Sequence, residues 1–257
     1  MRVAANLGTM FQDVPLLQRF EKAAKMGFKL VENPFPYSVE ASELRSTADK
    51  FNLKHVLINA PCGNVEIGER GIAASKNHLK DFEKSILKAI NYAKILECPK
   101  IHIMAGIFAR DEEAMKIYKM NIAFANEMLE RESIQLLIEP INPYTIPGYF
   151  VSSIPSALTA LEGTSNNAKL LFDIFHIQQI HGQISPFLKK YADRIGHIQV
   201  AQVPFRHEPD TKGELNYRYI FELMKTINDN WIVGCEYYNS TDTENSVQWV
   251  KDFGLDF

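Results

Sequence analysis

The feature that most constrains the fold of this chain is a repeated alternation of short β-rich runs with longer stretches of helical periodicity. Strands that alternate with helices form parallel βαβ units, because a helix carries the chain back to the start of the next parallel strand. Eight such units fit into the 257 residues, which is the arithmetic of a (β/α)8 barrel. We therefore predict an α/β fold in which residues 1–257 form one domain, a single (β/α)8 TIM barrel.

The sequence places eight strands and eight helical segments in regular order. The strands are expected at Val3–Asn6, Phe28–Glu32, His55–Asn59, Lys100–Ala105, Gln135–Glu139, Lys169–Asp173, Gly196–Val200 and Ile232–Glu236. The helices are expected at Pro15–Met26, Val39–Asn52, Ala73–Leu96, Glu112–Arg131, Ser152–Leu161, Ser185–Tyr191, Tyr217–Asn228 and Glu244–Asp252. An open doubly wound sheet is the alternative, but that fold normally carries a glycine-rich phosphate turn after its first strand, and residues 6–11 do not form one.

Composition excludes several classes of protein. The chain has 28 Lys and Arg against 31 Asp and Glu, a formal net charge of −3, and no basic stripe of the kind that binds nucleic acid. Its three cysteines, Cys62, Cys98 and Cys235, form no CxxC pair, so we expect reduced thiols rather than disulfides or a structural zinc site. The N-terminal apolar run is too short for a signal peptide, and no other run is long enough for a membrane span. We expect a soluble, cytoplasmic protein with no membrane partner.

Polar side chains stand at the end of seven of the eight predicted strands. Burying such groups costs several kcal/mol, on the order of 2–7 for a neutral polar group, unless they are paired or bind something. In a barrel the carboxyl ends of the strands converge on one rim, where active sites are built. For single residues the alternative is that a polar side chain marks where a strand leaves the core. These residues are Asn6, Glu32, Asn59, Glu139, Asp173, Gln199 and Glu236.

The last four of these residues predict a site for a divalent cation. Glu139, Asp173, Gln199 and Glu236 come from strands five to eight, and side-chain alternation lets all four face the interior of the barrel. Three carboxylates in one mouth repel one another, and a cation relieves that conflict. Because all the ligand atoms are oxygens, Mg²⁺ or Mn²⁺ is favoured over zinc. The layer beneath is expected to contain Leu137, Leu171, His197 and Gly234.

Two of the carboxylates are placed to move protons. Glu139 and Glu236 would lie on opposite sides of the cation, an arrangement suited to general acid–base catalysis on the two faces of a bound substrate. A metal that polarises a carbonyl acidifies the neighbouring C–H group. The reaction class that follows is aldose–ketose isomerisation or epimerisation. The sequence contains no GxSxG, HExxH or Walker A motif for a competing chemistry.

The chain resembles the hydroxypyruvate isomerase family, within the metal-dependent sugar isomerase and epimerase barrels related to xylose isomerase and tagatose 3-epimerase. The resemblance runs nearly end to end and depends on the order and spacing of short motifs. These are Ala5-Asn6-Leu7, Phe35-Pro36-Tyr37, Leu57-Ile58-Asn59, Ile101-His102-Ile103-Met104-Ala105-Gly106, Glu139-Pro140-Ile141-Asn142, Asp173-Ile174-Phe175-His176, His197-Ile198-Gln199, Gly213-Glu214-Leu215-Asn216-Tyr217 and Gly234-Cys235-Glu236-Tyr237.

The resemblance implies that Glu139 and Glu236 are the proton donor and acceptor, and that these two residues hold the metal together with Asp173 and Gln199. In the epimerase relatives the third ligand is usually His, whereas the hydroxypyruvate branch has Gln, as here. His176 matches a substrate-contacting histidine of the epimerases. The implied reaction converts hydroxypyruvate into 2-hydroxy-3-oxopropanoate (tartronate semialdehyde).

Two further residues are candidates for substrate binding. Arg206 could clamp a substrate carboxylate in a bidentate manner, or it could be a solvated loop charge. Glu32 could hydrogen-bond the substrate, orient a neighbour or cap the rim. The sequence departs from the family pattern at Phe205, where relatives commonly have glycine, and at Asn33-Pro34, where many have a more apolar run.

Other functions remain open at this stage. A ketose 3-epimerase, or an isomerase of a larger 2-oxo sugar acid, would use the same residues on a different small molecule. A nuclease of the endonuclease IV type would need a cluster of zinc-binding histidines and a basic surface, and a non-catalytic ligand-binding barrel would need a disabled site. The apolar segment Pro140–Phe150, if exposed, could form the contact of a homo-oligomer.

Overall fold

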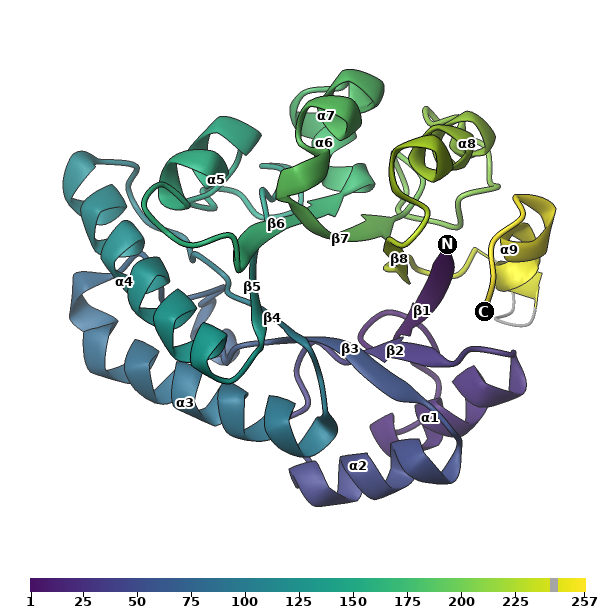
Figure 1. Ribbon diagram of the computed structural model, residues 1–257, viewed down its shortest axis with the longest axis horizontal. Coiled ribbons are helices and arrows are strands. Elements are labelled where there is room, and N and C mark those ends of the chain that lie inside the picture. Colours follow the sequence, from purple (N-terminus) through teal and green to yellow (C-terminus); the bar gives the residue numbers. More distant parts are fainter. Residues whose placement is uncertain (241–244) are drawn as a thin grey trace.

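The computed structural model of the chain describes residues 1–240 and 245–257. Its strands pair in parallel and in chain order, and the last strand pairs with the first to close a barrel (Figure 1). This confirms the predicted (β/α)8 barrel. The strands are β1 (Arg2–Asn6), β2 (Leu30–Glu32), β3 (Lys54–Asn59), β4 (Lys100–His102), β5 (Gln135–Ile138), β6 (Ala168–Asp173), β7 (Ile195–Val200) and β8 (Ile232–Cys235).

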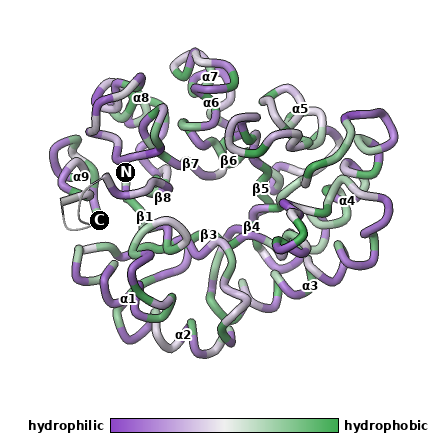
Figure 2. The backbone as a smooth tube through the Cα atoms, turned by 180° about the vertical axis from the view of Figure 1, so that it is seen from behind, coloured by the Kyte–Doolittle hydropathy of each residue, from purple (hydrophilic) through white to green (hydrophobic). Residues whose placement is uncertain are grey.

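Helices surround the barrel and cover its outer face (Figure 1). In Figure 2, which shows the molecule from behind, hydrophilic segments lie mainly along this outer ring. The α-helices are α1 (Leu16–Lys25), α2 (Ala41–Lys50), α3 (Leu79–Leu96), α4 (Glu112–Arg131), α5 (Ile154–Ala160), α6 (Ile174–Ile180), α7 (Ile184–Lys190), α8 (Tyr217–Asn228) and α9 (Gln248–Asp252). Short 3₁₀ helices occur at η1 (Val65–Ile67), η2 (Lys76–His78), η3 (Ala192–Arg194) and η4 (Asn245–Val247). In the part of the chain that the structure describes, no helix is long and apolar enough to cross a membrane.

Helix ends follow from local capping chemistry. The Asp111 side chain accepts a hydrogen bond from the Ala114 N–H at the start of α4, and Ser153 and Ser156 cap the start of α5 reciprocally. Both arrangements satisfy N–H groups that the first turn of a helix leaves without partners. Helix α4 accordingly spans the predicted residues, and α5 lies within its predicted segment.

The structure corrects the sequence prediction in several places. Strand β4 ends at His102 rather than Ala105, and Ala105 pairs instead with Gly71 in an isolated antiparallel bridge. Helix α3 begins at Leu79 rather than Ala73, and α6 was not predicted at all. The predicted start of the last helix, Glu244, lies outside the described residues; α9 begins at Gln248.

The segment at residues 140–150 is buried at its two ends and exposed in its middle, so the exposure that we expected of it holds only in part. Ile141, Tyr149 and Phe150 are at most 4% exposed, whereas Tyr144 is 79% exposed. The buried residues pack into the large core that surrounds the barrel. The segment therefore offers one exposed aromatic side chain for an intermolecular contact, not a continuous apolar face.

A small apolar cluster fills the barrel beneath the rim. Leu57, Leu137 and Leu171 from β3, β5 and β6 pack together there. Two residues further along their strands stand Asn59, Glu139 and Asp173. The alternation of side chains therefore places these polar groups one layer above an apolar floor, as predicted for Leu137 and Leu171.

Candidate active site

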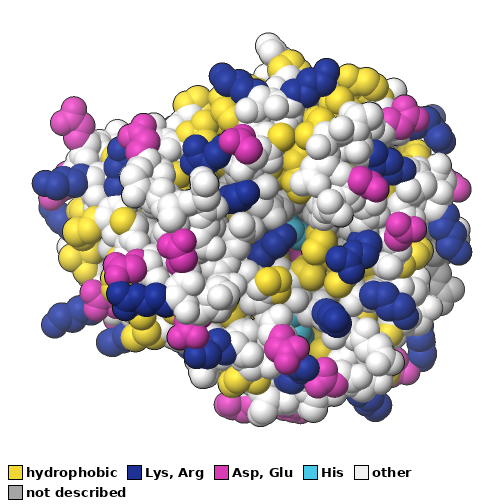
Figure 3. Space-filling view, in the orientation of Figure 1, with side chains coloured by type: hydrophobic (Ala, Val, Ile, Leu, Met, Phe, Trp, Pro, Cys, Tyr) yellow, Lys and Arg dark blue, Asp and Glu magenta, His cyan; other side chains and the backbone are white. Residues whose placement is uncertain are grey.

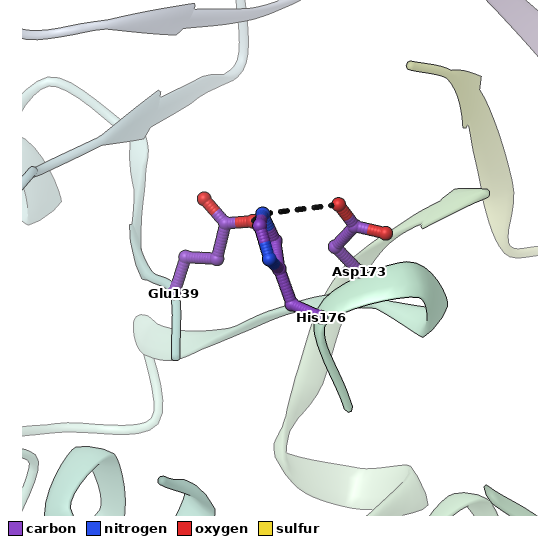
Figure 4. Close-up of side chains that lie close together, drawn as sticks. All are labelled: Glu139, Asp173 and His176. Carbon is purple, nitrogen blue, oxygen red and sulfur yellow. Dashed lines mark ion pairs between the residues drawn. The ribbon is translucent and has the colours of Figure 1, made fainter. Parts of the chain in front are cut away.

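Glu139, Asp173 and His176 form a compact group at the carboxyl ends of β5 and β6 (Figure 4). His176, in the first turn of α6, lies between the two carboxylates. Its Nε2 is 3.6 Å from Glu139 Oε1 and 3.5 Å from Asp173 Oδ2. All three residues are buried, and these separations are longer than a good hydrogen bond. The N–H of His176 therefore remains available to a third group.

Neighbouring hydrogen bonds determine which nitrogen of His176 carries a proton. The Asn142 side-chain oxygen accepts from the backbone N–H groups of Tyr144 and Thr145, so its NH₂ group is the end that faces His176 Nδ1 at 2.7 Å. The Asn142 backbone N–H also donates to Nδ1. Burial, and then the charge of Arg206, lower the pKa of His176 well below its ordinary value. The ring is therefore neutral, with its proton on Nε2, directed into the site.

Arg206 bridges two of the predicted metal ligands. Its Nη2 donates to Glu236 Oε2 at 2.7 Å and to Asp173 Oδ2 at 3.2 Å, while its Nε donates to the Glu236 carbonyl at 3.2 Å. The guanidinium also lies over the ring of Phe175, 4.9 Å from its centroid. Among the residues that the structure describes, none accepts a hydrogen bond from Nη1. That edge of the guanidinium is the one that a ligand could use.

The loop after β7 holds Arg206 in an unusual backbone conformation. Its φ of +58° lies in the left-handed region, which is uncommon for residues other than glycine. The buried Gln202 organises this loop: its side-chain amide donates to three loop carbonyls and accepts from the backbone N–H groups of Val203 and Leu215. The Arg206 N–H donates to the Gln202 carbonyl. The strained residue is therefore held by a network that only the folded loop provides.

The carboxylates share one electrostatic environment. Burial and then the charge of Glu236 raise the pKa of Glu139 well above its ordinary value. Burial also raises the pKa of Glu236 to about 7 and that of Asp173 to about 6, although Arg206 opposes both shifts. Burial alone would lower the pKa of Arg206, but Glu236 and Asp173 outweigh it and raise the value. Glu139 and Glu236 are linked through His176, Asp173 and Arg206, which lie between them in a chain of contacts.

Glu32 and Gln199 lie in contact with each other rather than in the group just described. The Gln199 Nε2 donates to Glu32 Oε2 at 2.8 Å. Gln199 pairs in register with Asp173 across β6 and β7, so its side chain lies beside that carboxylate. Glu32 is fully buried and also accepts from Asn6 and His197.

The residues of this site have the chemistry that a divalent cation requires. Glu139 Oε1 is buried without a hydrogen-bond partner, although a carboxylate oxygen normally has one. Three carboxylates with a single arginine leave more negative than positive charge in the site. Both features fit a bound cation, and possible ligand atoms of Glu139, Asp173 and His176 lie within 4.8 Å of one another. Glu236 is not part of this group: Arg206 lies between it and Asp173.

The sequence analysis missed the residues that orient the site. Asn142 stands in the Glu139-Pro140-Ile141-Asn142 motif, and that motif could have drawn attention to it. Gln202 had no comparable signal, because its partners are loop carbonyls that only the tertiary structure brings together. His102 is a buried neighbour of the site: its Nε2 is 3.8 Å from Glu139 Oε2.

Comparison with known proteins places this geometry in a family. A family model described as a xylose isomerase-like TIM barrel matches residues 20–253. A Caenorhabditis elegans protein provisionally named hydroxypyruvate isomerase is 47% identical, over 100% of this chain and 98% of that protein. The hydroxypyruvate isomerase of Escherichia coli strain K12 is 37% identical, over 98% and 99% of the two chains. The 2-oxo-tetronate isomerase of Cupriavidus necator is 40% identical, over 98% of each chain.

A solved structure from Brucella melitensis, named AP endonuclease, family 2, is also similar to this chain. It superimposes with a TM-score of 0.94 at 35% sequence identity and covers 98% of both chains. The similarity extends over nearly the whole barrel, so relatives with different names share this fold.

Proposed function

The chain belongs to the xylose isomerase-like TIM-barrel family, and from this premise we propose that it is an isomerase that interconverts hydroxypyruvate and 2-hydroxy-3-oxopropanoate. The observation that carries the proposal is the chain of contacts that joins Glu139, His176, Asp173, Arg206 and Glu236. Two carboxylates supply the groups that move a proton, and the guanidinium supplies a cationic anchor for the carboxylate of a 2-oxo acid.

Arg206 anchors the substrate in this proposal. Its Nη2 and Nε are held by Asp173 and Glu236, so the guanidinium is fixed before the substrate arrives. The Nη1 edge then donates to the substrate carboxylate. A neutral ketose has no group that would use this cation, which is why we favour a 2-oxo acid over a ketose 3-epimerase substrate.

The glutamates exchange protons with the two carbons that change oxidation level. Glu236, whose carboxylate is held by Arg206, removes a proton from C3 of hydroxypyruvate. The electron pair forms an enediolate between C2 and C3. Glu139 donates a proton to C2, the O3 hydroxyl loses its proton as the aldehyde forms, and O2 gains one.

His176 and a cation stabilise the oxygen that gains charge. The Nε2–H of His176 donates a hydrogen bond to the C2 carbonyl oxygen, in agreement with the substrate-binding role expected for this residue. We propose Glu139, Asp173, Gln199 and Glu236 as the ligands of Mg²⁺ or Mn²⁺. When bound, the cation polarises the substrate carbonyl and acidifies the adjacent C–H.

A second candidate substrate is 2-oxo-tetronate, the substrate in the name of the Cupriavidus necator relative. This acid has one more carbon and needs the same anchor and the same proton transfer. The nuclease alternative has less support. In the described residues, the group that could hold a metal contains one histidine rather than a cluster, and acidic and basic side chains are interspersed on the face seen in Figure 3.

The proposed activity is tested by NMR of the purified protein with hydroxypyruvate, 2-oxo-tetronate and a neutral ketose in D₂O. We expect conversion of the 2-oxo acids with deuterium entering at the carbon that is protonated, and no conversion of the ketose. Glu139→Gln and Glu236→Gln should each reduce turnover by about 100-fold or more, with unchanged circular dichroism. Chelation followed by addition of Mg²⁺ or Mn²⁺ tests the cation. Normal turnover by the double variant would contradict the proposed chemistry.

A further inference from the structure

Glu32 is a buried carboxylate to which the proposed reaction assigns no step. It leaves β2, is fully buried, and reaches across the interior to β7. The space for it exists because residue 234 on β8 is glycine: a Cβ there would lie 1.8 Å from Glu32 Oε1. Because the Glu32 side chain occupies the space beside Gly234, its path through the interior of the barrel is fixed.

Every polar side chain in contact with Glu32 is a hydrogen-bond donor. The Asn6 Nδ2 donates to Oε2 at 2.7 Å and the Gln199 Nε2 donates to the same oxygen at 2.8 Å. The Nε2 of His197 contacts Oε1. Lys100 Nζ lies 3.4 Å from His197 Nδ1, which therefore accepts and leaves the imidazole proton on Nε2, facing Glu32. The carboxylate thus receives donors from β1 and β7.

These contacts determine the orientation of two amides. The Glu32 oxygens are the acceptors in these contacts, so each amide turns its NH₂ end toward Glu32. For Asn6 the opposite end is also satisfied, because its Oδ1 accepts from the Gly8 N–H at 2.9 Å. For Gln199 the same constraint turns Oε1 away from Glu32. Gln199 pairs with Gly234, next to which Glu32 lies, on one side and with Asp173 on the other, so we infer that this oxygen faces Asp173.

We propose that Glu32 is a positioning residue that acts through Gln199. By holding the Gln199 NH₂ group, it presents the Gln199 oxygen, and not the nitrogen, to a cation bound beside Asp173. The inference rests on the proposed function only in taking a divalent cation as the ligand. Without Glu32 the amide could rotate and direct N–H groups at the cation, which repels them. Partners of metal ligands commonly contribute 10- to 100-fold to metal affinity.

The first test measures Mn²⁺ binding to the substrate-free protein by electron paramagnetic resonance of the free ion. We expect Glu32→Gln and Gln199→Ala each to weaken binding by about tenfold, and the double variant to be no weaker than Gln199→Ala, because both changes remove the same ligand. Asn6→Ala is the matched control: it removes a donor to Glu32 without touching Gln199, and binding should stay within about twofold of wild type. Unchanged binding in Glu32→Gln, or additive losses in the double variant, would overturn the inference.

The second test needs no metal and no activity. In a ¹⁵N-labelled sample, the side-chain NH₂ resonances of Gln199, assigned by their loss in Gln199→Ala, should exchange with solvent slowly in wild type and faster in Glu32→Gln. If the NH₂ protons of Gln199 in the wild-type protein exchange as fast as those of an exposed glutamine, the inference is overturned. This result does not depend on whether Glu32→Gln folds. If wild type binds no Mn²⁺ but the NH₂ group is protected, the cation of the proposed function fails while the orienting role of Glu32 stands.

Discussion

At the scale of single residues, two amides set the hydrogen-bonding character of this site. Asn142 turns its NH₂ group toward His176 because its oxygen is occupied by two backbone N–H groups. Gln199 turns its NH₂ group toward Glu32. The orientation of Asn142 therefore determines which nitrogen of His176 carries the proton. The orientation of Gln199 determines that its oxygen points away from Glu32.

A substitution that replaces the side-chain NH₂ group of Asn142 by an oxygen should change the tautomer of His176. We predict that Asn142→Asp moves the imidazole proton from Nε2 to Nδ1, because a carboxylate at position 142 accepts from Nδ1–H. The new side chain still accepts from the Tyr144 and Thr145 N–H groups, so the turn is preserved. Nε2 then has no proton for the substrate oxygen, and turnover should fall by about 100-fold.

Nitrogen-15 shifts of the His176 ring measure this change directly. Wild type should show a protonated Nε2 and the variant a protonated Nδ1, with the same circular dichroism. A variant that kept the wild-type tautomer, or that kept full turnover with the tautomer reversed, would contradict the role of His176 as a donor.

The positions of the candidate residues at the strand ends were predictable from the sequence, but the orientations of their side chains were not. The placement of Glu139, Asp173, Gln199 and Glu236 at successive strand ends follows from periodicity alone. Which end of an amide faces inward depends on backbone N–H groups of a folded turn. Arg206 is the clearest case, because the sequence did not distinguish a residue that binds the substrate carboxylate from a solvated loop charge. Its left-handed backbone conformation and its contact with two carboxylates arise only in the folded loop.

At the scale of secondary structure, the junction between β6 and α6 combines two roles in one side chain. Asp173 is the last residue of β6 and the N-cap of α6, and its Oδ1 accepts from the Phe175 N–H at 2.9 Å. Its other oxygen faces Arg206 and His176. The sequence analysis did not predict α6, because seven residues give too little periodicity to distinguish a helix from the end of a buried strand.

A pair of substitutions separates these roles. Asp173→Asn should keep the cap, since Asn caps helices as well as Asp, and lose cation binding with the charge. Asp173→Ala should lose both, with a further loss of about 1 kcal/mol in the free energy of unfolding. Urea unfolding and Mn²⁺ titration of the two variants measure the two effects. Equal stability of both variants would show that the cap contributes nothing.

At the scale of the whole molecule, closure of the barrel was the most predictable property. Eight alternating units admit few arrangements, and the polar strand ends meet at one rim because all the strands are parallel. The sensitivity of the fold to acid was not predictable, since it depends on burial. His55 is one contributor: it packs on Phe20 of α1 with ring centroids 5.5 Å apart, and neither ring nitrogen has a hydrogen-bond partner.

Burial lowers the pKa of His55 to about 4. The unfolded chain, with a histidine pKa of about 6.5, therefore binds more protons between these values, so the stabilising contribution is complete above pH 6.5 and is lost as the pH falls toward 4. We predict that His55→Phe, which cannot be protonated, loses less stability than wild type over this range, by up to about 3 kcal/mol. Urea unfolding at pH 7 and pH 5 measures the difference. Parallel pH dependences in the two proteins would exclude this role of His55.

The two halves of the chain contribute differently to the proposed cation site. The proposed cation ligands, Glu139, Asp173, Gln199 and Glu236, all belong to the second four strands, whereas Glu32 comes from the first four. A fragment containing only β5–β8 would possess every ligand and lack the carboxylate that orients one of them. If two halves of the chain were produced separately and recombined, they would therefore have to restore the contact between Glu32 and Gln199 in the interior of the barrel. Restoring the hydrogen bonds between β4 and β5 and between β8 and β1 would not be enough.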